Sequence, residues 1–210
     1  MLSQDRDLHS WSSLEIRLLN TVDVFLHKPA IMKKAEANLL ELKQVIIEEL
    51  SQAPHPCPTG SDILKGQIVR GENHKGFPFI SLDMPQMFSK TQMFTYRTLF
   101  WWGHDLIFSL ILKQIDQVPV IKKLIQLKEY PEWKEIYLSI APSPWEWEKR
   151  SNNFIPISEA SEKKIRETID SIQYIKLCRF HSLNDPAFPE LNWTDTGLAT
   201  WKIFSKINVE

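Results

Sequence analysis

The densest group of side chains able to do chemistry in this 210-residue sequence lies at 71–88. Glu72, His74 and Asp83 stand there between runs of alternating apolar residues. An imidazole can act as a general base or a ligand, and a neighbouring carboxylate can orient it. The same stretch also suits a polar hairpin loop in which Gly76 supplies a positive φ. Both interpretations stay open at this point.

Arg97 interrupts an otherwise apolar and aromatic run at 93–102. An arginine turned inward needs a carboxylate or an anionic ligand, because an unpaired buried charge is strongly unfavourable. We expect Glu72 or Asp83, on neighbouring strands, to accept its hydrogen bonds in a bidentate pair. If that pair is only partly covered, the remaining donors face a cleft and predict a site for a small anion. The alternative places Arg97 on the solvent face beside Thr95.

Three further residues complete the candidate ligand contacts. His104 follows a glycine at the expected turn, where it could meet His74. Trp145 and Trp147 alternate with glutamates and share one face of an extended segment. Such a pair could form an aromatic platform for a sugar ring, a base or a partner protein, although ordinary packing would use the same residues.

The sequence predicts no metal site and no cofactor. Its six histidines are scattered without helical spacing, and Cys57 and Cys178 are far apart and outside any zinc pattern. The segment 66–71 has the glycine spacing that begins a P-loop. Glu72 and Asn73 then stand where that loop requires lysine and a hydroxyl residue, so phosphate and magnesium would not be held.

Charge and hydropathy limit the classes of partner and the cellular compartment that we expect for this protein. Lys and Arg number 25 and Asp and Glu 26, so the basic excess typical of nucleic-acid binding is missing. Five cations at 163–179, including Lys176 and Arg179, are interpreted as a solvated helix face. The most apolar stretch, 99–112, is too short for a membrane span. Few cysteines and a polar N-terminal segment predict a cytoplasmic protein that binds neither nucleic acid nor membrane.

The elements that would position these residues follow from hydrophobic periodicity. Period-two alternation predicts strands at 67–70, 79–84, 93–102 and 106–112, with a hairpin turning at 103–105. Periodicity alone also admits a helix over 91–113, but the aromatic and β-branched content favours strands.

Helices are expected at both ends of the chain. A capping box at Ser12 begins a helical stripe over 12–52. The first helix should end near Lys28, before Pro29, so that the stripe forms two helices or one kinked helix. Further helices are expected after Asp116, after Ser158 and after Thr194 or Asp195. We expect Leu18, Leu42, Phe100 and Phe108 to be buried.

The pattern predicts an α+β fold, an antiparallel β-sheet built from sequential strands and covered by N-terminal and C-terminal amphipathic helices. It predicts one domain over 1–210, helical at 12–52, strand-rich at 64–112 and mixed at 116–207. The phrases at 71–88 and 97–103 resemble small bacterial proteins of an uncharacterised family. That resemblance covers 66–112 and implies a bacterial source, but it carries no activity, cofactor or catalytic residue.

The function that the sequence favours is a soluble binding or interaction domain, with a small anionic ligand site near the strands of 71–105. The partner would be a small molecule or a protein. One alternative is an enzyme of hydrolytic or acid–base type that uses Glu72, His74, Asp83 and Arg97, which requires His74 and Asp83 to converge. Another is a self-association module that forms a homodimer through exposed tryptophan and phenylalanine side chains.

Overall fold

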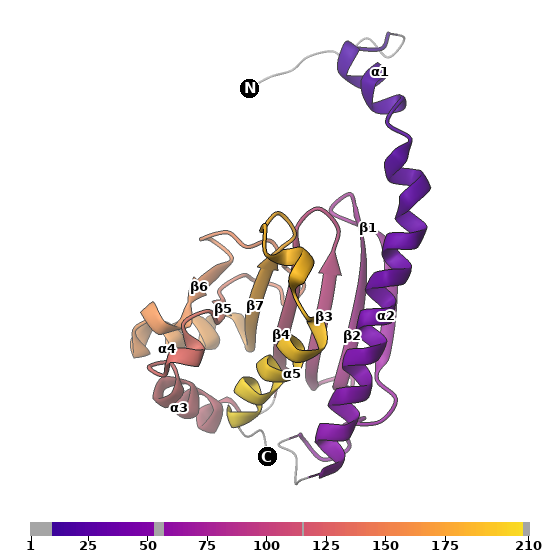
Figure 1. Cartoon of the computed structure of the whole chain (residues 1–210). Coiled ribbons are helices and arrows are strands. Elements are labelled where there is room, and N and C mark those ends of the chain that lie inside the picture. The colour runs from indigo at the N-terminus through magenta and orange to yellow at the C-terminus, as the bar shows by residue number, and fades with distance from the viewer. Residues whose placement is uncertain (1–9, 53–56, 115, 208–210) are drawn as a thin grey trace. The chain divides into compact units, whose positions relative to one another are not determined.

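The computed structural model describes residues 10–52, 57–114 and 116–207 (Figure 1). Contacts divide the chain into two units, 1–34 and 35–210. The first unit contains helix α1 (Ser13–Leu19) and the start of helix α2 (Asp23–Gln52). The expected capping box is confirmed, because Glu15 N donates to Ser12 Oγ and the Glu15 carboxylate accepts from Ser12 N at 2.8 Å.

The first helix ends at Leu19 and the break lies at residues 20–22, so the prediction that this helix ends near Lys28 is wrong. Asn20 Nδ2 donates to the Ile16 carbonyl at 2.8 Å, and Thr21 Oγ1 donates to the Arg17 carbonyl at 3.0 Å. These side chains satisfy the last carbonyls of α1 and end it. Pro29 lies inside α2, where a proline removes one backbone hydrogen bond from a helix that has many others.

The second unit is built on a seven-stranded antiparallel sheet with the order β1-β2-β3-β4-β7-β5-β6 (Figure 1). With helices at both ends, this confirms the expected α+β class. The first four strands form a meander of sequential neighbours. Their bounds are β1 (Gln67–His74), β2 (Phe77–Phe88), β3 (Met93–Trp101) and β4 (Asp105–Lys113).

Both expected turns of the meander are present. β1 and β2 are joined at Lys75 and Gly76, which have φ of 52° and 90°, and the Asn73 side-chain oxygen accepts from Gly76 N. β3 and β4 pair in register up to Phe100 opposite Leu106, with a positive φ at Gly103 between them. The hairpin prediction for 99–112 is therefore confirmed, and a helix there is excluded.

The remaining strands do not follow sequence order. β7 (Tyr174–Ser182) lies between β4 and β5, and it pairs with β4 over nine residues. β5 (Tyr137–Ser139) meets β7 at only two positions, and β6 (Phe154–Pro156) pairs with β5. The helices of this half are α3 (Gln117–Leu127), α4 (Glu162–Ile172) and α5 (Trp193–Phe204), with 3-10 turns at Pro131–Trp133, Ile157–Glu159, Phe188–Glu190 and Ser205–Ile207.

Two helix starts differ from expectation by a few residues. α4 is capped by Ser161 instead of Ser158, because 157–159 forms a 3-10 turn first. α5 is capped by Asn192, whose side chain accepts from Asp195 N at 3.0 Å. The Asp116 cap of α3 is confirmed.

One face of the sheet is the main core and is covered by α5 and the later part of α2. Tyr96 on β3 donates its hydroxyl to the Gly197 carbonyl of α5 at 2.6 Å. A Cβ on Gly197 would lie 2.7 Å from a Leu42 methyl carbon and 3.0 Å from the Phe108 ring, so any larger residue at this position would force these side chains to shift. Leu42, Phe108 and Phe100 are buried as predicted. Leu18, in the first unit, is 57% exposed, and its predicted burial is wrong.

Candidate functional site

The sheet face opposite α5 is covered by chain without helix or strand. We name residues 143–148 the tryptophan segment, since it carries Trp145 and Trp147. Trp147 packs into a buried cluster with residues from β3, β4 and β7, including Trp101, Ile107 and Cys178. Charged side chains gather beneath and around the segment, and they form the candidate site.

The predicted inward pairing of Arg97 is confirmed, with Asp83 as its partner. The two residues lie directly opposite each other on β3 and β2. Arg97 Nε donates to Asp83 Oδ1 at 2.8 Å and Nη2 donates to Oδ2 at 2.7 Å, while Thr95 adds a hydroxyl donor at 2.7 Å. Asp83 is fully buried, and its charge is balanced by that of Arg97.

Arg97 also meets both tryptophans of the segment. Its guanidinium carbon lies 4.8 Å from the Trp145 ring centroid and 5.9 Å from that of Trp147, within cation–π range. The Arg97 side chain is 15% exposed, and Trp145 is 43% exposed. Within the described residues, Nη1 of Arg97 makes no hydrogen bond. The structure therefore brings together three of the predicted ligand contacts and leaves two N–H donors available beside an open indole.

Lys176 lies at the centre of this face, and the sequence interpretation missed it. It sits on β7 and is fully buried, so its assignment to a solvated helix face is wrong. Its ammonium is 3.3 Å from the Trp147 ring centroid and donates to the carbonyls of Pro144 at 2.9 Å and Glu146 at 2.5 Å. Its position in the sequence could have indicated this burial, because alternation along the strand places Lys176 on the same face as Tyr174 and Cys178.

The electrostatic setting of Lys176 is unusual. Burial is the main cause that lowers its pKa to about 8; the charge of Arg97 acts in the same direction, and Cys178 and Glu146 act in the opposite direction. Among the described residues, no carboxylate lies within hydrogen-bond distance of its ammonium. A lysine charge is thus held by two carbonyl dipoles and an indole face.

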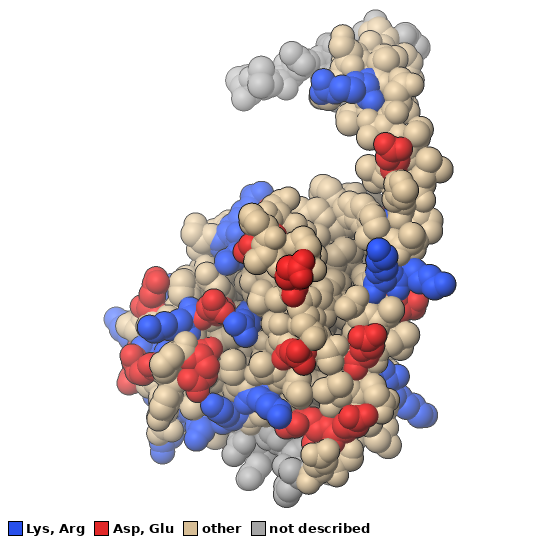
Figure 2. Space-filling model, viewed as in Figure 1, with Lys and Arg blue, Asp and Glu red and all other residues tan. Residues whose placement is uncertain are grey.

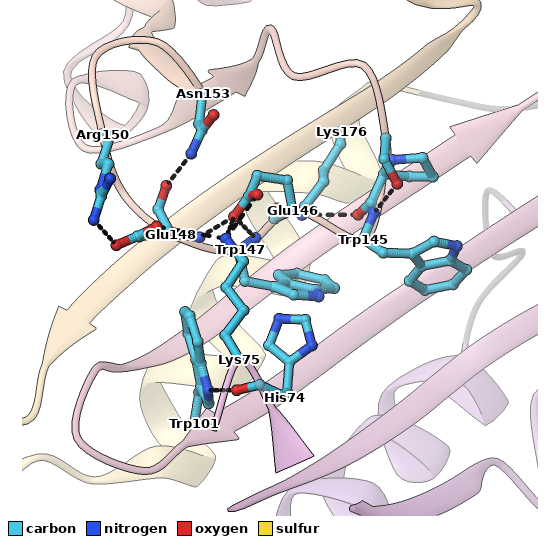
Figure 3. A network of polar contacts seen from close by, with 12 residues as sticks. His74, Lys75, Trp101, Trp145, Glu146, Trp147, Glu148, Arg150, Asn153 and Lys176 are labelled. Atoms are coloured by element: carbon cyan, nitrogen blue, oxygen red, sulfur yellow. Dashed lines mark hydrogen bonds and ion pairs between the residues drawn. The ribbon is translucent and has the colours of Figure 1, made fainter. Parts of the chain in front are cut away.

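Ion pairs hold the same segment from outside (Figure 3). Lys75, in the β1–β2 turn, bonds both Glu146 oxygens at 2.7 and 2.8 Å and reaches Glu148 at 3.4 Å. Arg150 pairs with Glu148. Hydrogen bonding to Glu146 raises the pKa of Lys75. Partial burial tends to raise the pKa of Glu146, but the bonds from Lys75 and from backbone N–H groups bring it below its usual value.

The two candidate histidines gather around Trp101. The His104 ring stacks on Trp101 with centroids 3.6 Å apart, and the His74 ring meets the edge of Trp101 at 5.0 Å. Burial, followed by the charge of Lys75, lowers the pKa of His74, which favours a neutral imidazole.

The histidines do not join the Arg97 pair. Asp83 is opposite Gln67 at the start of β1, whereas His74 is at its end, which separates them by roughly 20 Å along the strand. Glu72 lies in the irregular end of β1, also away from Asp83. An acid–base site would therefore need another partner for His74. No group of three or more potential metal ligands occurs among the described residues.

A hollow lies beside the end of β7. This groove of about 250 Å³ is lined by cations, acids and aromatic rings, namely Lys134, Glu135, Tyr137, Lys149, Phe180, His181, Ser182 and Asp185. Lys149 stands 4.2 Å from the Tyr137 ring centroid. Burial lowers the pKa of His181. The mixed charges of the groove do not select one ligand class.

The rest of the surface gives little further indication of the ligand class. Acidic and basic side chains are interspersed on the face seen in Figure 2. In the described part of the chain, no helix combines the length and the apolar character that a membrane crossing requires.

Comparison with known proteins does not assign the chain to a family. No family model, curated protein or solved structure matches it. The resemblance of residues 66–112 to bacterial proteins stays a prediction, and the function has to be argued from the geometry.

Proposed function

We propose that the chain is a binding module whose tryptophan segment and Arg97 together take a small organic anion. The observation that carries this proposal is the free Nη1 edge of Arg97 beside the half-exposed Trp145 ring. A carboxylate could accept from Nη1 while a flat group attached to it stacks on the indole.

The local charge supports an anion over a cation. Asp83 balances Arg97, and Lys176 adds a positive charge that no carboxylate in the described part of the chain contacts directly. Partial burial lowers the effective dielectric constant, so that charge acts more strongly here than in bulk water. The free thiols of Cys57 and Cys178 suit a reducing compartment, and we place this function in the cytoplasm.

Titration with benzoate tests the proposal, with acetate and inorganic phosphate as comparison anions at constant ionic strength. Benzoate offers both a carboxylate and a stacking plane, whereas acetate lacks the plane. We expect saturable quenching of tryptophan fluorescence and a rise in melting temperature with benzoate, and weaker effects with acetate.

Variants connect the signal to the site. Trp145→Leu removes the stacking surface without leaving a buried charge, and it should abolish the preference for benzoate over acetate. Lys163→Ala, an exposed cation on α4, should leave the titration unchanged. Absence of saturable benzoate binding, or equal binding by Trp145→Leu, would refute the proposal.

A further inference from the structure

The first unit exposes an unusual amount of apolar surface. We name residues 11–34 the arm. Ten of its large apolar side chains are between 38% and 73% exposed, namely Trp11, Leu14, Ile16, Leu18, Leu19, Val22, Val24, Phe25, Leu26 and Ile31. Most of the arm surface seen in Figure 2 carries no charge. Exposed apolar side chains gathered in this number on one short segment point to an interaction surface.

The apolar side chains point in several directions around the helix. Val24, Phe25 and Leu26 are consecutive, and at about 100° per residue they face three sides of α2. A lipid surface covers one face of an amphipathic helix. A helix that is apolar on several sides is stable when other helices enclose it, which favours protein over membrane as the occupant.

The two halves of the arm carry opposite net charges, so two arms that run in opposite directions attract each other. Its first half, 11–23, has a net charge of −1, and its second half, 24–34, has a net charge of +3. The residues concerned are Glu15, Arg17 and Asp23 in the first half and Lys28, Lys33 and Lys34 in the second. An antiparallel pair sets each acidic half beside a basic half, and a two-fold axis produces that arrangement from identical chains.

We propose that the arms of two copies of this chain pair antiparallel and form a homodimer. The ten exposed side chains amount to roughly 1,000 Å² per copy around the whole arm, and an antiparallel pair buries the part of that area that faces the partner. This interface is independent of the anion site, and neither proposal requires the other.

Sedimentation equilibrium of the full chain tests the dimer. The wild type should approach twice the chain mass of 24.6 kDa as concentration rises. Phe25→Glu keeps good helix propensity and should weaken the dimer by at least about 30-fold in Kd. Val118→Glu alters an equally exposed apolar residue on α3, which is 72% exposed, and should leave the mass unchanged.

Charge reversal tests the antiparallel order. Lys33→Glu combined with Lys34→Glu makes both halves acidic. The dimer should weaken at low salt and recover part of its affinity at high salt, because exposed charges are screened. Lys163→Glu is the matched control. Unchanged affinity in the double variant, or a loss that salt does not reduce, would overturn the antiparallel arrangement.

The experiments distinguish the dimer from other ways of covering the arm. A chain that stays monomeric at every concentration overturns the proposal, whether its arm then cosediments with anionic lipid vesicles or is protected from hydrogen exchange within the monomer. A dimer that survives Phe25→Glu also overturns it, because the interface would then lie elsewhere.

Discussion

Replacement of Lys176 by methionine removes a buried charge from the centre of the sheet. Methionine has a similar length and can fill the space over Trp147. The change also removes the two donors that bind the Pro144 and Glu146 carbonyls. At neutral pH these effects oppose each other, so the pH dependence of stability is the more informative measurement.

The size of the expected change in the free energy of unfolding follows from the pKa of Lys176. A decrease from 10.5 in the unfolded chain to about 8 in the folded chain corresponds to a cost of ~3 kcal/mol for holding the proton when folded. The full cost applies below pH 8. Between about pH 8 and pH 10.5 the unfolded chain binds more protons than the folded chain, so stability contributed by this group rises with pH. The cost is gone above that window.

Ionisation of the two cysteines makes stability fall with rising pH, opposite to the effect of Lys176. Burial raises the pKa values of Cys57 and Cys178 to about 12, so the unfolded chain loses these protons first and stability falls above pH 9. Both thiols remain in Lys176→Met. The difference between wild type and variant therefore isolates the lysine, with Arg97 and Glu146 as the charged groups that remain near position 176.

Urea unfolding from pH 7 to pH 9 provides the assay. Relative to Lys176→Met, the wild type should gain about 1 kcal/mol in free energy of unfolding over that range. Lys163→Met, which alters an exposed lysine, should show no such change relative to wild type. A wild-type-minus-variant difference that is flat with pH would show that Lys176 titrates normally and that its described environment is wrong.

Three further changes test the core by urea midpoints. Tyr96→Phe should cost about 1 to 2 kcal/mol, because the buried Gly197 carbonyl loses its 2.6 Å donor; an unchanged midpoint would contradict that bond. Gly197→Ala should cost about 1 to 3 kcal/mol, since the new Cβ overlaps Leu42 and Phe108, and a stabilised variant would refute the close approach. Leu42→Ala should cost about 2 to 5 kcal/mol while Leu18→Ala, measured at a protein concentration where the chain is monomeric, stays within about 0.5 kcal/mol; similar costs would show that the arm is buried.

Local patterns in the sequence predicted the meander well. Side-chain alternation places Phe94, Tyr96 and Phe100 on one sheet face, and the glycines at 76 and 103 supply the positive φ that the turns need. The sequence could predict that Arg97 pairs with Glu72 or Asp83, because a charge within an apolar strand requires a partner on an adjacent strand, and the structure shows that the partner is Asp83.

Long-range placement could not be predicted from the same patterns. Nothing local to 174–182 indicates that β7 inserts between β4 and β5, and that insertion is what buries Lys176. Lys176 donates to carbonyls of the tryptophan segment, about thirty positions away in the sequence. Because the acceptors are backbone atoms, which every residue has, the residue types do not indicate this contact. The apolar stripe at Leu18 and Phe25 was visible, but periodicity does not state whether a stripe packs inside the chain or outside it.

The position of β7 also sets the order in which the sheet can form during synthesis. β1 to β4 pair with sequential neighbours, so this meander can close as soon as it is made, with short loops. β5 and β6 join the sheet only through β7, which is made after both of them. Until residues 174–182 emerge, β4 remains an open edge whose side chains are mostly apolar, a template for pairing with another chain. A nascent chain stalled before β7 would therefore be prone to aggregation, and completion of that one strand both closes the edge and brings in the last two strands.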